Sequence, residues 1–446
     1  MFDQTREKIL QALFDSAKKT EDKIYIVGGF PRDLTLGKYD FHDIDVIVFG
    51  DYKNFAKLVS FHLNKPMIEI EKYKIVRIFY NGISIDICAP KDKDLISDLK
   101  KRDFTINSLI IPVENILDPL NSIMDPLGSG REDIKLLSLR TYVHPALVIK
   151  EDPNRIVRAA RFIADGFIAE EKLVRECKNR VKSLTAVPRE RIGEELRKMF
   201  LAKRPSAGLF FLREIGFFEA TYPKITPALY KPQKSPYHFE GVFEHCARVV
   251  DITPPDIVLR LSAFFHDIGK AFAEREIPDG RTVYWGHEFI SADICQDFLS
   301  TFKFPESERE KVKFIVKNHM IYYSPSWSDN AVRRLIKKLG QHTDDVLEFV
   351  YYDIKALKDP SKALEGLNEL KRRIKEEIIK LGKSEIKSPL NGHEIQKIFN
   401  IKEGKIIGEI KSRIENAIVE GKIKPTKEEA IKFVQKLLNN MKEKQN

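Results

Sequence analysis

The sequence predicts an α+β head, a mixed sheet with helices, followed by helices throughout the rest of the chain. Short apolar runs typical of strands are confined to roughly the first 140 residues, and beyond about Val143 apolar residues recur at helical spacing. At 446 residues the chain is long enough for several hydrophobic cores. We therefore expect a head over residues 1–140, a helical neck over 141–222, a second helical unit over 237–359 and a lysine-rich helical tail over 360–446.

Within the head, a helix over residues 6–18 is predicted before four strands. The strands are expected at residues 24–27, 44–49, 74–80 and 84–88. Asn81-Gly82 separates the last two strands, and this dipeptide favours the two-residue turn of a β-hairpin. The last two strands should therefore pair with each other.

The neck should consist of helices over residues 153–165, 170–184 and 189–201, with Gly166 stopping the first. Pro153 suits a first helical turn, with Asp152 as its N-cap. A proline-rich, polar stretch over 222–236 is typical of a linker. The second helical unit is expected to begin beyond it.

Bulk composition restricts the compartment and the partners. The net charge of +10 and the pI near 9.1 favour a polyanionic partner. The four cysteines contain no CxxC pair, so we expect reduced thiols. The N-terminus lacks the layout of a signal peptide and no apolar run approaches 18 residues. A cytoplasmic protein with no membrane span is expected.

A diglycine turn and an aspartate pair are the most informative feature of the head. Gly28 and Gly29 follow a predicted strand and let backbone amides approach a phosphate, and Arg32 adds a positive charge. Asp43 and Asp45 alternate along the next strand, so both carboxylates face one side. Paired carboxylates opposite a phosphate-binding turn suit Mg²⁺ with a triphosphate. Taken alone, such an aspartate pair is more typical of a solvated strand edge after an ordinary turn.

Asp86, in the hairpin strand, is a candidate third carboxylate. It could help to activate an attacking hydroxyl, or it could simply terminate the edge of the strand. Further along, Arg102, Asp103 and Asn107 offer a phosphate clamp, an acceptor for a ribose hydroxyl and a bidentate amide. Asp125-Pro-Leu-Gly128 predicts a turn before the next helix.

The segment from Glu151 to Arg161 combines acceptors with guanidinium donors. Asp152 and Arg155 could together read the Watson–Crick edge of a base, because a carboxylate accepts from an exocyclic amine and a guanidinium donates to ring acceptors. Arg155 and Arg158 lie three apart and should share a helix face. An ordinary salt-bridge cluster at a helix start is the alternative.

Taken in order, these motifs resemble those of the class II tRNA nucleotidyltransferases, the bacterial CCA-adding enzymes and poly(A) polymerases. The matching motifs, between about residues 24 and 212, are Gly28-Gly-x-x-Arg32-Asp33, Asp43-x-Asp45, Arg102-Asp-Phe-Thr-Ile-Asn107, Asp125-Pro-Leu-Gly128, Glu151-Asp-x-x-Arg155 and Arg191-x-x-x-Glu195-x-x-Lys198. The resemblance implies a nucleotidyltransferase-type head and an all-α neck. It also implies attack of a tRNA 3′-hydroxyl on the α-phosphate of CTP, or of CTP and then ATP, with release of pyrophosphate.

The resemblance also implies roles for the matching residues. Asp43 and Asp45 would bind catalytic Mg²⁺, and the glycines with Arg32 and Asp33 would hold the nucleotide. Arg102, Asp103 and Asn107 would engage phosphate and sugar. Glu151, Asp152 and Arg155, with Arg158 beside them, would select the base, and Arg191, Glu195 and Lys198 would brace the neck helices.

Two departures from the family pattern bear on specificity. Lys101 stands where the family usually has an arginine. Asp86 and Asp103 are only 17 positions apart, whereas full CCA-adding members carry a longer loop that serves the switch from CTP to ATP. The short loop resembles that of enzymes that add only CC, so the sequence favours a CC-adding enzyme. A full CCA-adding enzyme and a poly(A) polymerase remain alternatives.

A second constellation follows the linker. His266-Asp267 ends an apolar helix, where both residues are costly to bury unless they bind something. With His245 and Asp353 these residues resemble the metal quartet of HD-type phosphohydrolases, and His287 and His319 would bind a second metal or phosphate. The ion could be Mg²⁺, Mn²⁺ or Ni²⁺. The resemblance implies an HD-type domain over 237–359 with possible phosphatase or phosphodiesterase activity. The alternatives are a helical domain that only supports tRNA, or an HD-type hydrolase whose head merely binds RNA.

Overall fold

The computed structural model describes residues 2–71, 74–232, 241–381, 386–401 and 404–443. It divides into two compact units, Met1–Pro223 and Lys224–Asn446. Among the described residues, no helix is both long enough and apolar enough to cross a membrane. The four cysteines are free thiols, as the sequence predicted.

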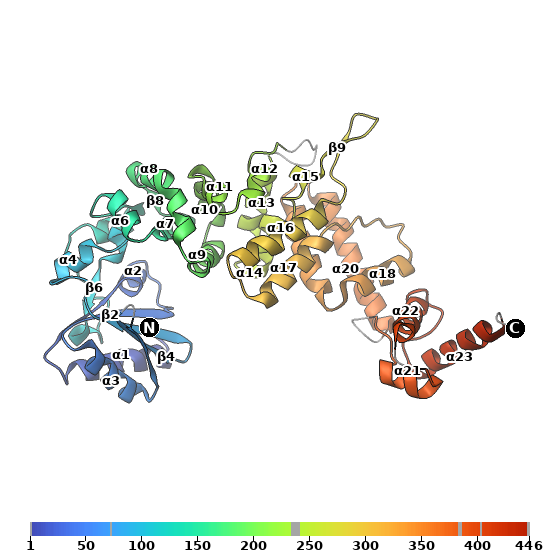
Figure 1. Cartoon of the computed structure of the whole chain (residues 1–446), viewed down its shortest axis with the longest axis horizontal. Helices are drawn as coiled ribbons and strands as arrows, with labels where there is room; N and C mark the ends of the chain where they lie inside the picture. The colour runs from blue at the N-terminus through green and yellow to red at the C-terminus, as the bar shows by residue number, and fades with distance from the viewer. Residues whose placement is uncertain (1, 72–73, 233–240, 382–385, 402–403, 444–446) are drawn as a thin grey trace. The chain divides into compact units, whose positions relative to one another are not determined.

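The first unit begins with a six-stranded mixed sheet (Figure 1), which confirms the predicted fold class. The spatial order of its strands is β3, β4, β5, β2, β1, β6, and only β2 and β5 pair in parallel. The strands are β1 Lys23–Val27, β2 Asp43–Phe49, β3 Met67–Ile70, β4 Ile75–Tyr80, β5 Ile83–Cys88 and β6 Ile110–Pro112. Helices α1 (Gln4–Ala17) and α3 (Tyr52–Leu63) lie together beside this sheet (Figure 1). Two strands of this sheet were not predicted: β3 is half exposed without strict alternation, and β6 has three residues.

The predicted hairpin is confirmed. Tyr80 pairs with Ile83 across the turn, and both turn residues have positive φ, 47° at Asn81 and 85° at Gly82. Asn and Gly tolerate this left-handed conformation better than other residues. The turn thereby sets the register that places Arg77 of β4 opposite Asp86 of β5.

Helices make up most of the remainder of the first unit. They are α2 Gly29–Thr35, α4 Leu95–Lys100, α5 Gly130–Lys135, α6 Pro145–Glu151, α7 Arg155–Ala164, α8 Glu171–Arg180, α9 Arg189–Leu201, α10 Pro205–Glu214 and α11 Phe217–Thr221. The prediction of an N-cap at Asp152 was wrong, because α6 ends at Glu151 and α7 starts only at Arg155. Asp152 instead accepts a hydrogen bond from the Asn154 amide (3.2 Å) in the short connection. Gly166, with φ of 106°, follows the end of α7 as expected.

The predicted linker is wrong in its first half. Pro223–Ile225 forms a 3₁₀ turn and Thr226–Leu229 forms helix α12, with Ile225 and Leu229 fully buried. The prolines therefore begin helical turns, a position they tolerate because the first amides of a helix need no partner. Residues 233–236 of the predicted linker lie outside the described residues.

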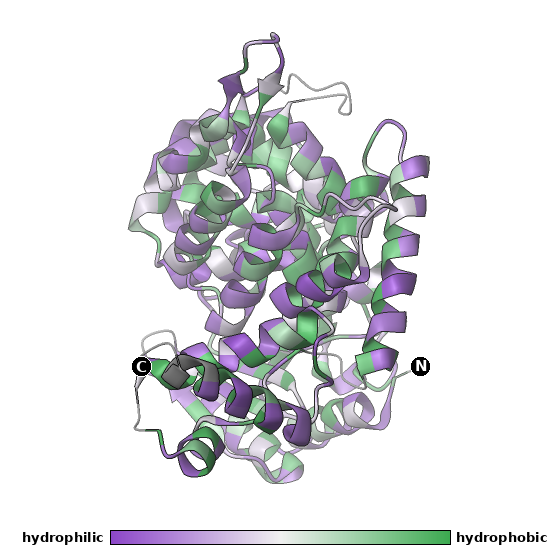
Figure 2. Cartoon of the chain, turned by 90° about the vertical axis from the view of Figure 1, so that its right-hand side faces the viewer, coloured by the Kyte–Doolittle hydropathy of each residue, from purple (hydrophilic) through white to green (hydrophobic). Residues whose placement is uncertain are grey.

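In the described part of the second unit, the strands are β9 (Arg275–Glu276) and β10 (Thr282–Val283), which pair as a short hairpin, and the other elements are helical. Green and purple residues alternate along most of its helices, as expected for amphipathic elements around a core (Figure 2). Its main helices are α13 Val242–Ile252, α14 Ile257–Phe265, α15 Lys270–Ala273, α16 His287–Thr301, α17 Glu306–Asn318, α18 Asp329–Leu339, α19 Thr343–Lys355, α20 Ser361–Leu381, α21 Gly392–Phe399, α22 Lys405–Val419 and α23 Lys427–Glu443.

Candidate functional site

The aspartate pair lies on β2, the strand between β1 and β5. Both carboxylates are on the exposed face of the strand. Exposed Asp43 and Asp45 alternate with buried residues, as predicted. The register pairs Asp45 with Val27 of β1 and with Asp86 of β5. Because paired residues of neighbouring strands project to the same face, the three aspartates share one face of the sheet.

The diglycine turn meets this face directly after β1. Gly28 has φ of 77°, and a Cβ there would lie 2.8 Å from Asp45 Oδ2. Only glycine allows both this backbone conformation and this close approach. The backbone of the turn is thereby brought against the aspartate that the sequence predicted as a metal ligand.

Two cavities open on this face, one of about 860 Å³ and the other of about 430 Å³. Both are lined by Asp45, Arg102, Asp103, Arg158 and Lys198. The larger also contains the diglycine, Arg32, Asp33, Asp43, Asn107 and Arg161, and the smaller contains Asp152, Asn154, Arg155 and Arg191. Phosphate-binding and base-selecting candidates thus surround the aspartates in a continuous set of residues.

The charge on Asp45 is costly in this setting. The pKa of Asp45 is raised to about 6, chiefly by burial within the cavity wall, with the Asp43 and Asp86 carboxylates adding to the effect of burial and Arg102 opposing it. The side chain is nevertheless open to the cavity. A cation placed between the carboxylates would remove this repulsion, so the donor set fits Mg²⁺.

Arg102 carries an unused donor at the same site. Its Nε is buried and has no hydrogen-bond partner among the residues that the structure describes, and its guanidinium lies 3.8 Å from Asp98 Oδ2. Buried donors usually have a partner, and Arg102 lines both cavities, so its guanidinium is placed to meet an acceptor that is not part of the chain. A phosphate oxygen fits this position.

A continuous polar network links the head to the neck. Arg32 Nη1 donates to Asn107 Oδ1 (2.6 Å), and Asn107 Nδ2 donates to Asp103 Oδ1 (2.8 Å). Arg158 then joins Asp103 (2.7 Å) to Glu195 of α9 (3.1 Å). Arg161, one helical turn further along α7, also pairs with Glu195 (3.1 Å). The side chains predicted to contact phosphate and sugar therefore hold one another in position.

Asp103 is the centre of this network. Burial alone would raise its pKa, but the Arg158 guanidinium and hydrogen bonds from Asn107 and the Phe104 amide outweigh it and hold the pKa of Asp103 well below its usual range. A carboxyl with a depressed pKa stabilises the fold above its unfolded pKa, near 3.8, and loses that contribution as the pH falls.

Replacing Asp103 by Asn should therefore lower the free energy of unfolding at pH 7 by about 3 kcal/mol, because Arg158 loses its buried partner. The difference from the unmodified protein should shrink as the pH falls below about 4, where the unfolded carboxyl becomes protonated. Urea unfolding at pH 7 and pH 3 measures both effects. The exposed Asp40, paired with Arg6, is a matched control, and Asp40→Asn should change stability by less than about 1 kcal/mol.

Asp86 is engaged more fully than the other two aspartates. Arg77 Nε and Nη2 donate to its two carboxylate oxygens, each at 2.7 Å. The sequence left open whether Asp86 helps to activate the attacking hydroxyl or only terminates the strand edge. In the structure Asp86 lies beside Asp45, and the Arg77 guanidinium holds its carboxylate. Asp86 is half-buried and fixed in orientation.

The predicted base-selecting residues are brought together only in part. Asp152 lines the smaller cavity and pairs with Arg191 of α9 (2.7 Å). Arg155 lines the same cavity but is buried, donating to the Val148 and Lys101 carbonyls, both at 3.0 Å, and to Glu151. Glu151 is exposed and lines neither cavity. Arg158 shares the cavity-facing side of α7 with Arg155, as predicted.

Several lining residues were not singled out from the sequence. Arg161 continues the three-residue spacing of Arg155 and Arg158, and that periodicity could have identified it. Asp98 is buried beside Arg102 at the i, i+4 spacing. Phe162 lies under the Arg32 guanidinium at 5.0 Å, a contact between distant segments that no local pattern announces.

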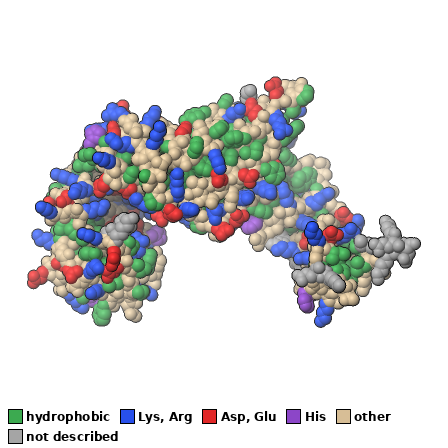
Figure 3. Space-filling view, in the orientation of Figure 1, with side chains coloured by type: hydrophobic (Ala, Val, Ile, Leu, Met, Phe, Trp, Pro, Cys, Tyr) green, Lys and Arg blue, Asp and Glu red, His purple; other side chains and the backbone are tan. Residues whose placement is uncertain are grey.

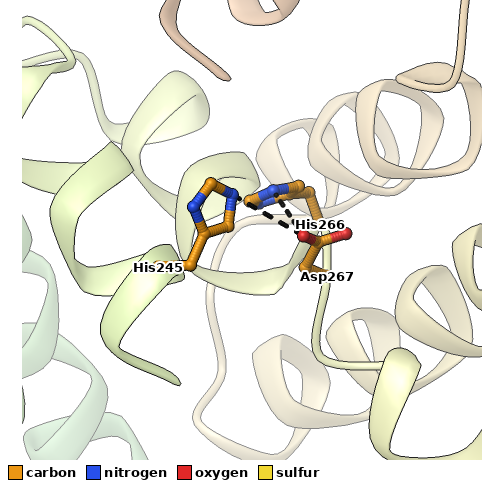
Figure 4. A group of neighbouring side chains, drawn as sticks. All are labelled: His245, His266 and Asp267. Carbon is orange, nitrogen blue, oxygen red and sulfur yellow. Dashed lines mark ion pairs between the residues drawn. The ribbon is translucent and has the colours of Figure 1, made fainter. Parts of the chain in front are cut away.

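In the second unit, four residues predicted as an HD-type quartet come together between α13, α14 and α19. His245 and His266 lie 3.6 Å and 3.3 Å from Asp267 Oδ2, and 3.3 Å and 3.2 Å from Asp353 Oδ1. Figure 4 shows His245, on one helix, facing the adjacent residues His266 and Asp267 on another segment. His287 Nε2 reaches the other oxygen of Asp267 at 3.2 Å, and His319 belongs to the same group.

Contacts of the second ring nitrogen, Nδ1, fix the orientation of three of the histidines. The Nδ1 atoms of His266, His287 and His319 face the carbonyls three residues earlier, at 2.9, 2.8 and 2.7 Å. A ring that donates from Nδ1 leaves the Nε2 lone pair free, which is the common arrangement of metal-binding histidine. Nε2 of both His266 and His287 is buried and lies 3.2–3.3 Å from carboxylate oxygens, but among the described residues neither makes a contact with hydrogen-bond geometry.

The donors form two overlapping groups, His245–His266–Asp267 and Asp267–His287–His319, each with its ligand atoms within 4.8 Å. Without an ion, burial would lower the pKa of His266, but Asp267 and Asp353 outweigh it and raise that pKa well above the usual value. Lys270 Nζ adds a further positive charge 2.6 Å from Asp267. The buried carboxylates thus favour positive charge at this place, and imidazole with carboxylate donors fits a divalent cation.

Three family models match the chain in the expected order. The poly(A) polymerase head domain covers residues 24–140, a probable RNA- and SrmB-binding site of polymerase A covers 166–229, and the HD domain covers 237–381.

Curated relatives share these parts. The A-adding tRNA nucleotidyltransferase of Deinococcus radiodurans is 27% identical over 362 residues, 78% of this chain and 80% of the relative. The multifunctional CCA protein of Cupriavidus necator is 30% identical over 343 residues, 71% of this chain and 80% of the relative. The CC-adding tRNA nucleotidyltransferase of Shouchella clausii is 36% identical over 195 residues, 43% of this chain and 48% of the relative.

Solved structures share the fold. The Bacillus stearothermophilus CCA-adding enzyme in complex with CTP aligns over the whole of both chains with a TM-score of 0.67 and 20% identity. The Thermotoga maritima CCA-adding enzyme complexed with tRNA aligns over 98% of this chain and 96% of that chain, with a TM-score of 0.54 and 21% identity.

Proposed function

The chain belongs to the family of CCA-adding tRNA nucleotidyltransferases, and we propose that it adds cytidine to the 3′ end of tRNA as a CC-adding enzyme. In the reaction, the terminal 3′-oxygen of the tRNA forms a bond to the α-phosphorus of CTP and the bond to the β-phosphate oxygen breaks. Pyrophosphate leaves and the proton of the hydroxyl is released. The observation that carries the proposal is the shared face of Asp43 and Asp45 opposite the diglycine turn.

Asp43 and Asp45 would hold Mg²⁺, which when bound would stabilise charge on the α-phosphate and lower the pKa of the attacking hydroxyl. The orphaned Nε of Arg102 and the Gly28-Gly29 backbone would bind phosphate oxygens. Asp103 would orient the sugar, since the network through Asn107 and Arg158 fixes its carboxylate. Asp86 would act beside Asp45, held there by Arg77.

Base selection is assigned to the smaller cavity. Asp152 would accept from the exocyclic amine of the base, and Arg155 would donate to its ring acceptors after exchanging the carbonyls it now contacts. Arg191 and Glu195 of α9 would hold Asp152 and Arg158 in place. Glu151 would act through Arg155, because the carboxylate pairs with Arg155 and lines neither cavity.

The segment between Asp86 and Asp103 supports addition of cytidine alone. Buried Asp98 accepts from the Lys91 amide (2.6 Å), Asp92 pairs with Lys101 (2.7 Å), and Asp94 caps α4. A loop that reshaped the site for ATP would need conformational freedom, whereas this short segment is held by these three contacts. A rigid wall suits a site that accepts one base.

Sequencing the product ends tests this specificity. The protein is incubated with tRNA lacking its 3′ end, CTP, ATP and Mg²⁺, and the 3′ termini of the products are sequenced. The expected termini end in CC. Efficient addition of a terminal A would refute CC specificity in favour of a CCA-adding enzyme, and long A tails would indicate a poly(A) polymerase.

An exposed basic surface in the neck supports tRNA as the partner. Lys and Arg side chains are prominent over the α4–α9 region on the face shown in Figure 3. On α8, Lys172, Arg175 and Lys178 are exposed. Such residues suit contacts to the sugar–phosphate backbone.

Reversing two of these charges, Arg175→Glu with Lys178→Glu, should weaken tRNA binding and make the dependence of log K on log salt shallower by about 2, because two phosphate contacts are lost. Filter binding between 50 and 300 mM KCl measures the slope. The double variant Lys371→Glu with Lys375→Glu on α20 is a charge-matched control. An unchanged slope in the α8 variant would remove this surface from the interface.

A second activity is favoured by the histidine–aspartate cluster. Five donor residues converge there with Asp353 beside them, and three histidines present Nε2 inward from rings fixed by backbone carbonyls. His245, His266, Asp267 and Asp353 would hold a first divalent cation, and His287 and His319 a second cation or a phosphate. A bound cation would polarise a phosphate ester. We propose hydrolysis of a phosphoester, in which a water oxygen bonds to phosphorus, the ester P–O bond breaks and the leaving alcohol takes up a proton.

A further inference from the structure

An apolar cavity of about 760 Å³ lies beside the histidine–aspartate cluster, between α19, α20 and residues 321–325. Its walls include Val350 and Ile354 of α19, Gly366 and Leu370 of α20, and Tyr322 and Tyr323 of the connecting segment. Neither the nucleotidyl transfer nor the phosphoester hydrolysis proposed above uses this cavity.

The cavity and the cluster share one helix and one segment. Asp353 lies on α19 between Val350 and Ile354, and Val350, three residues before it, shares its side of the helix, while Leu357 lines the cavity from just beyond the helix end. His319 precedes Ile321, at the start of the cavity wall, by two residues. A ligand that occupied the cavity would therefore adjoin the residues proposed to bind metal.

Tyr322 stands at the mouth between the two. The side chain of Tyr322 is 75% exposed and is therefore not packed into the core. Partial burial raises the pKa of its hydroxyl, and the carboxylates of Glu288 and Asp267 raise it further while Lys270 opposes them. Its phenol is thus within electrostatic reach of the cluster, although its ring lines the apolar cavity.

The second tyrosine gives the cavity a fixed aromatic wall. The Tyr323 ring lies 5.5 Å from the Trp327 ring, edge to face, and Arg373 contacts its hydroxyl at 3.5 Å. Asp359, Lys362 and Glu365 supply polar groups at the same cavity. An exposed ring and a fixed ring, with polar groups beside them, suit a flat aromatic ligand with hydrogen-bonding edges.

We infer that this cavity receives the base of a nucleotide whose phosphate lies at the histidine–aspartate cluster, with Tyr322 stacking on the base. A nucleotide carries both an anionic phosphate, which suits the cluster, and a flat base, which suits the neighbouring aromatic cavity. The inference rests on the proposed hydrolytic function of the cluster, and its tests are arranged so that the two can fail separately.

Binding without catalysis is the first test. In metal-free protein with methyl-labelled isoleucine, adenosine should shift the δ1-methyl signals of Ile321 and Ile354, and ribose alone should not. Tyr322→Ala should raise the adenosine concentration for half-maximal shift about tenfold, and Tyr322→Phe, which keeps the ring, should leave it unchanged. If adenosine leaves these methyl signals unmoved in the unmodified protein, the inference is overturned.

A second variant does not depend on Tyr322. A Cβ at Gly366 would lie 3.6 Å from Tyr323 Cδ1, so Gly366→Leu fills the cavity without an initial clash. It should abolish the adenosine-induced shifts. Ile379→Ala, on the same helix at a side chain that is 79% exposed and lines no part of the cavity, should leave them unchanged.

Kinetics separate the inference from the proposed hydrolysis. With 2′,3′-cyclic AMP, Tyr322→Ala should raise KM about tenfold at unchanged kcat, whereas hydrolysis of glycerol 1,2-cyclic phosphate, which has no base, should not change. An equal effect on both substrates, or no effect on either, would overturn the inference. If the unmodified protein hydrolyses neither substrate, the hydrolytic function fails, and the adenosine shifts alone decide whether the cavity binds a base.

Discussion

Asp45→Ala is expected to abolish nucleotide addition, with kcat falling by at least about 10³-fold, because a carboxylate that holds the catalytic cation is lost. Asp45 lies directly beside Asp86 and against the Gly28 turn, so no neighbouring side chain can take its place without moving the sheet. Incorporation of labelled CMP into tRNA that lacks its 3′ end measures the loss.

The same variant should bind tRNA almost as well as the unmodified protein, because the exposed basic surface of α8 is untouched. It should also fold at least as stably at pH 8. Burial raises the pKa of Asp45 to about 6, so ionisation disfavours the metal-free fold as the pH rises from about 4 through 6. Asp118→Ala, at an exposed loop carboxylate, is the control for activity and stability. CMP incorporation by Asp45→Ala near the unmodified rate would refute the assignment of Asp45 as a metal ligand.

Asp267→Asn is expected to abolish phosphoester hydrolysis and to reduce bound metal while CMP addition continues. Its two oxygens face different histidines, His266 at 3.3 Å and His287 at 3.2 Å, so both donor groups lose a charged ligand. Hydrolysis of 2′,3′-cyclic AMP with Ni²⁺, Mn²⁺ or Mg²⁺ measures activity, and elemental analysis measures metal content. His266→Ala should behave in the same way.

The control for this site is His393→Ala, an exposed histidine of the second unit. It should leave hydrolysis and metal content unchanged. Equal hydrolysis by Asp267→Asn and by the unmodified protein would rule out this cluster as the hydrolytic site. Loss of metal without any hydrolysis in the unmodified protein would leave a structural metal centre.

The sequence predicted the features that rest on local periodicity and turn chemistry. Alternation along β2 placed Asp43 and Asp45 on one face, and Asn81-Gly82 specified the hairpin that brings Arg77 to Asp86. Helical spacing predicted the cavity-facing side of α7. These features depend on neighbours within about one helical turn or one strand pair.

Features set by tertiary contacts could be predicted less well from the sequence. The start of α7 was misplaced because Asp152 pairs with Arg191 of α9, a partner 39 residues away, and because α6 occupies the residues just before it. Arg155 was expected to face a base, yet it donates to the Lys101 carbonyl 54 residues earlier. Proline-rich residues 223–229 fold as buried turns because apolar Ile225 and Leu229 find a core.

The central claim is that the aspartate site adds cytidine and stops. Single-turnover rate constants test it most directly, with enzyme in excess over tRNA ending in C or in CC, and with CTP or ATP as the only nucleotide. CMP addition to the C-ending tRNA should be at least about 10³-fold faster than AMP addition to the CC-ending tRNA, a difference of about 4 kcal/mol in activation free energy. Rate constants within about tenfold of each other would contradict the claim and identify a site that also accepts ATP.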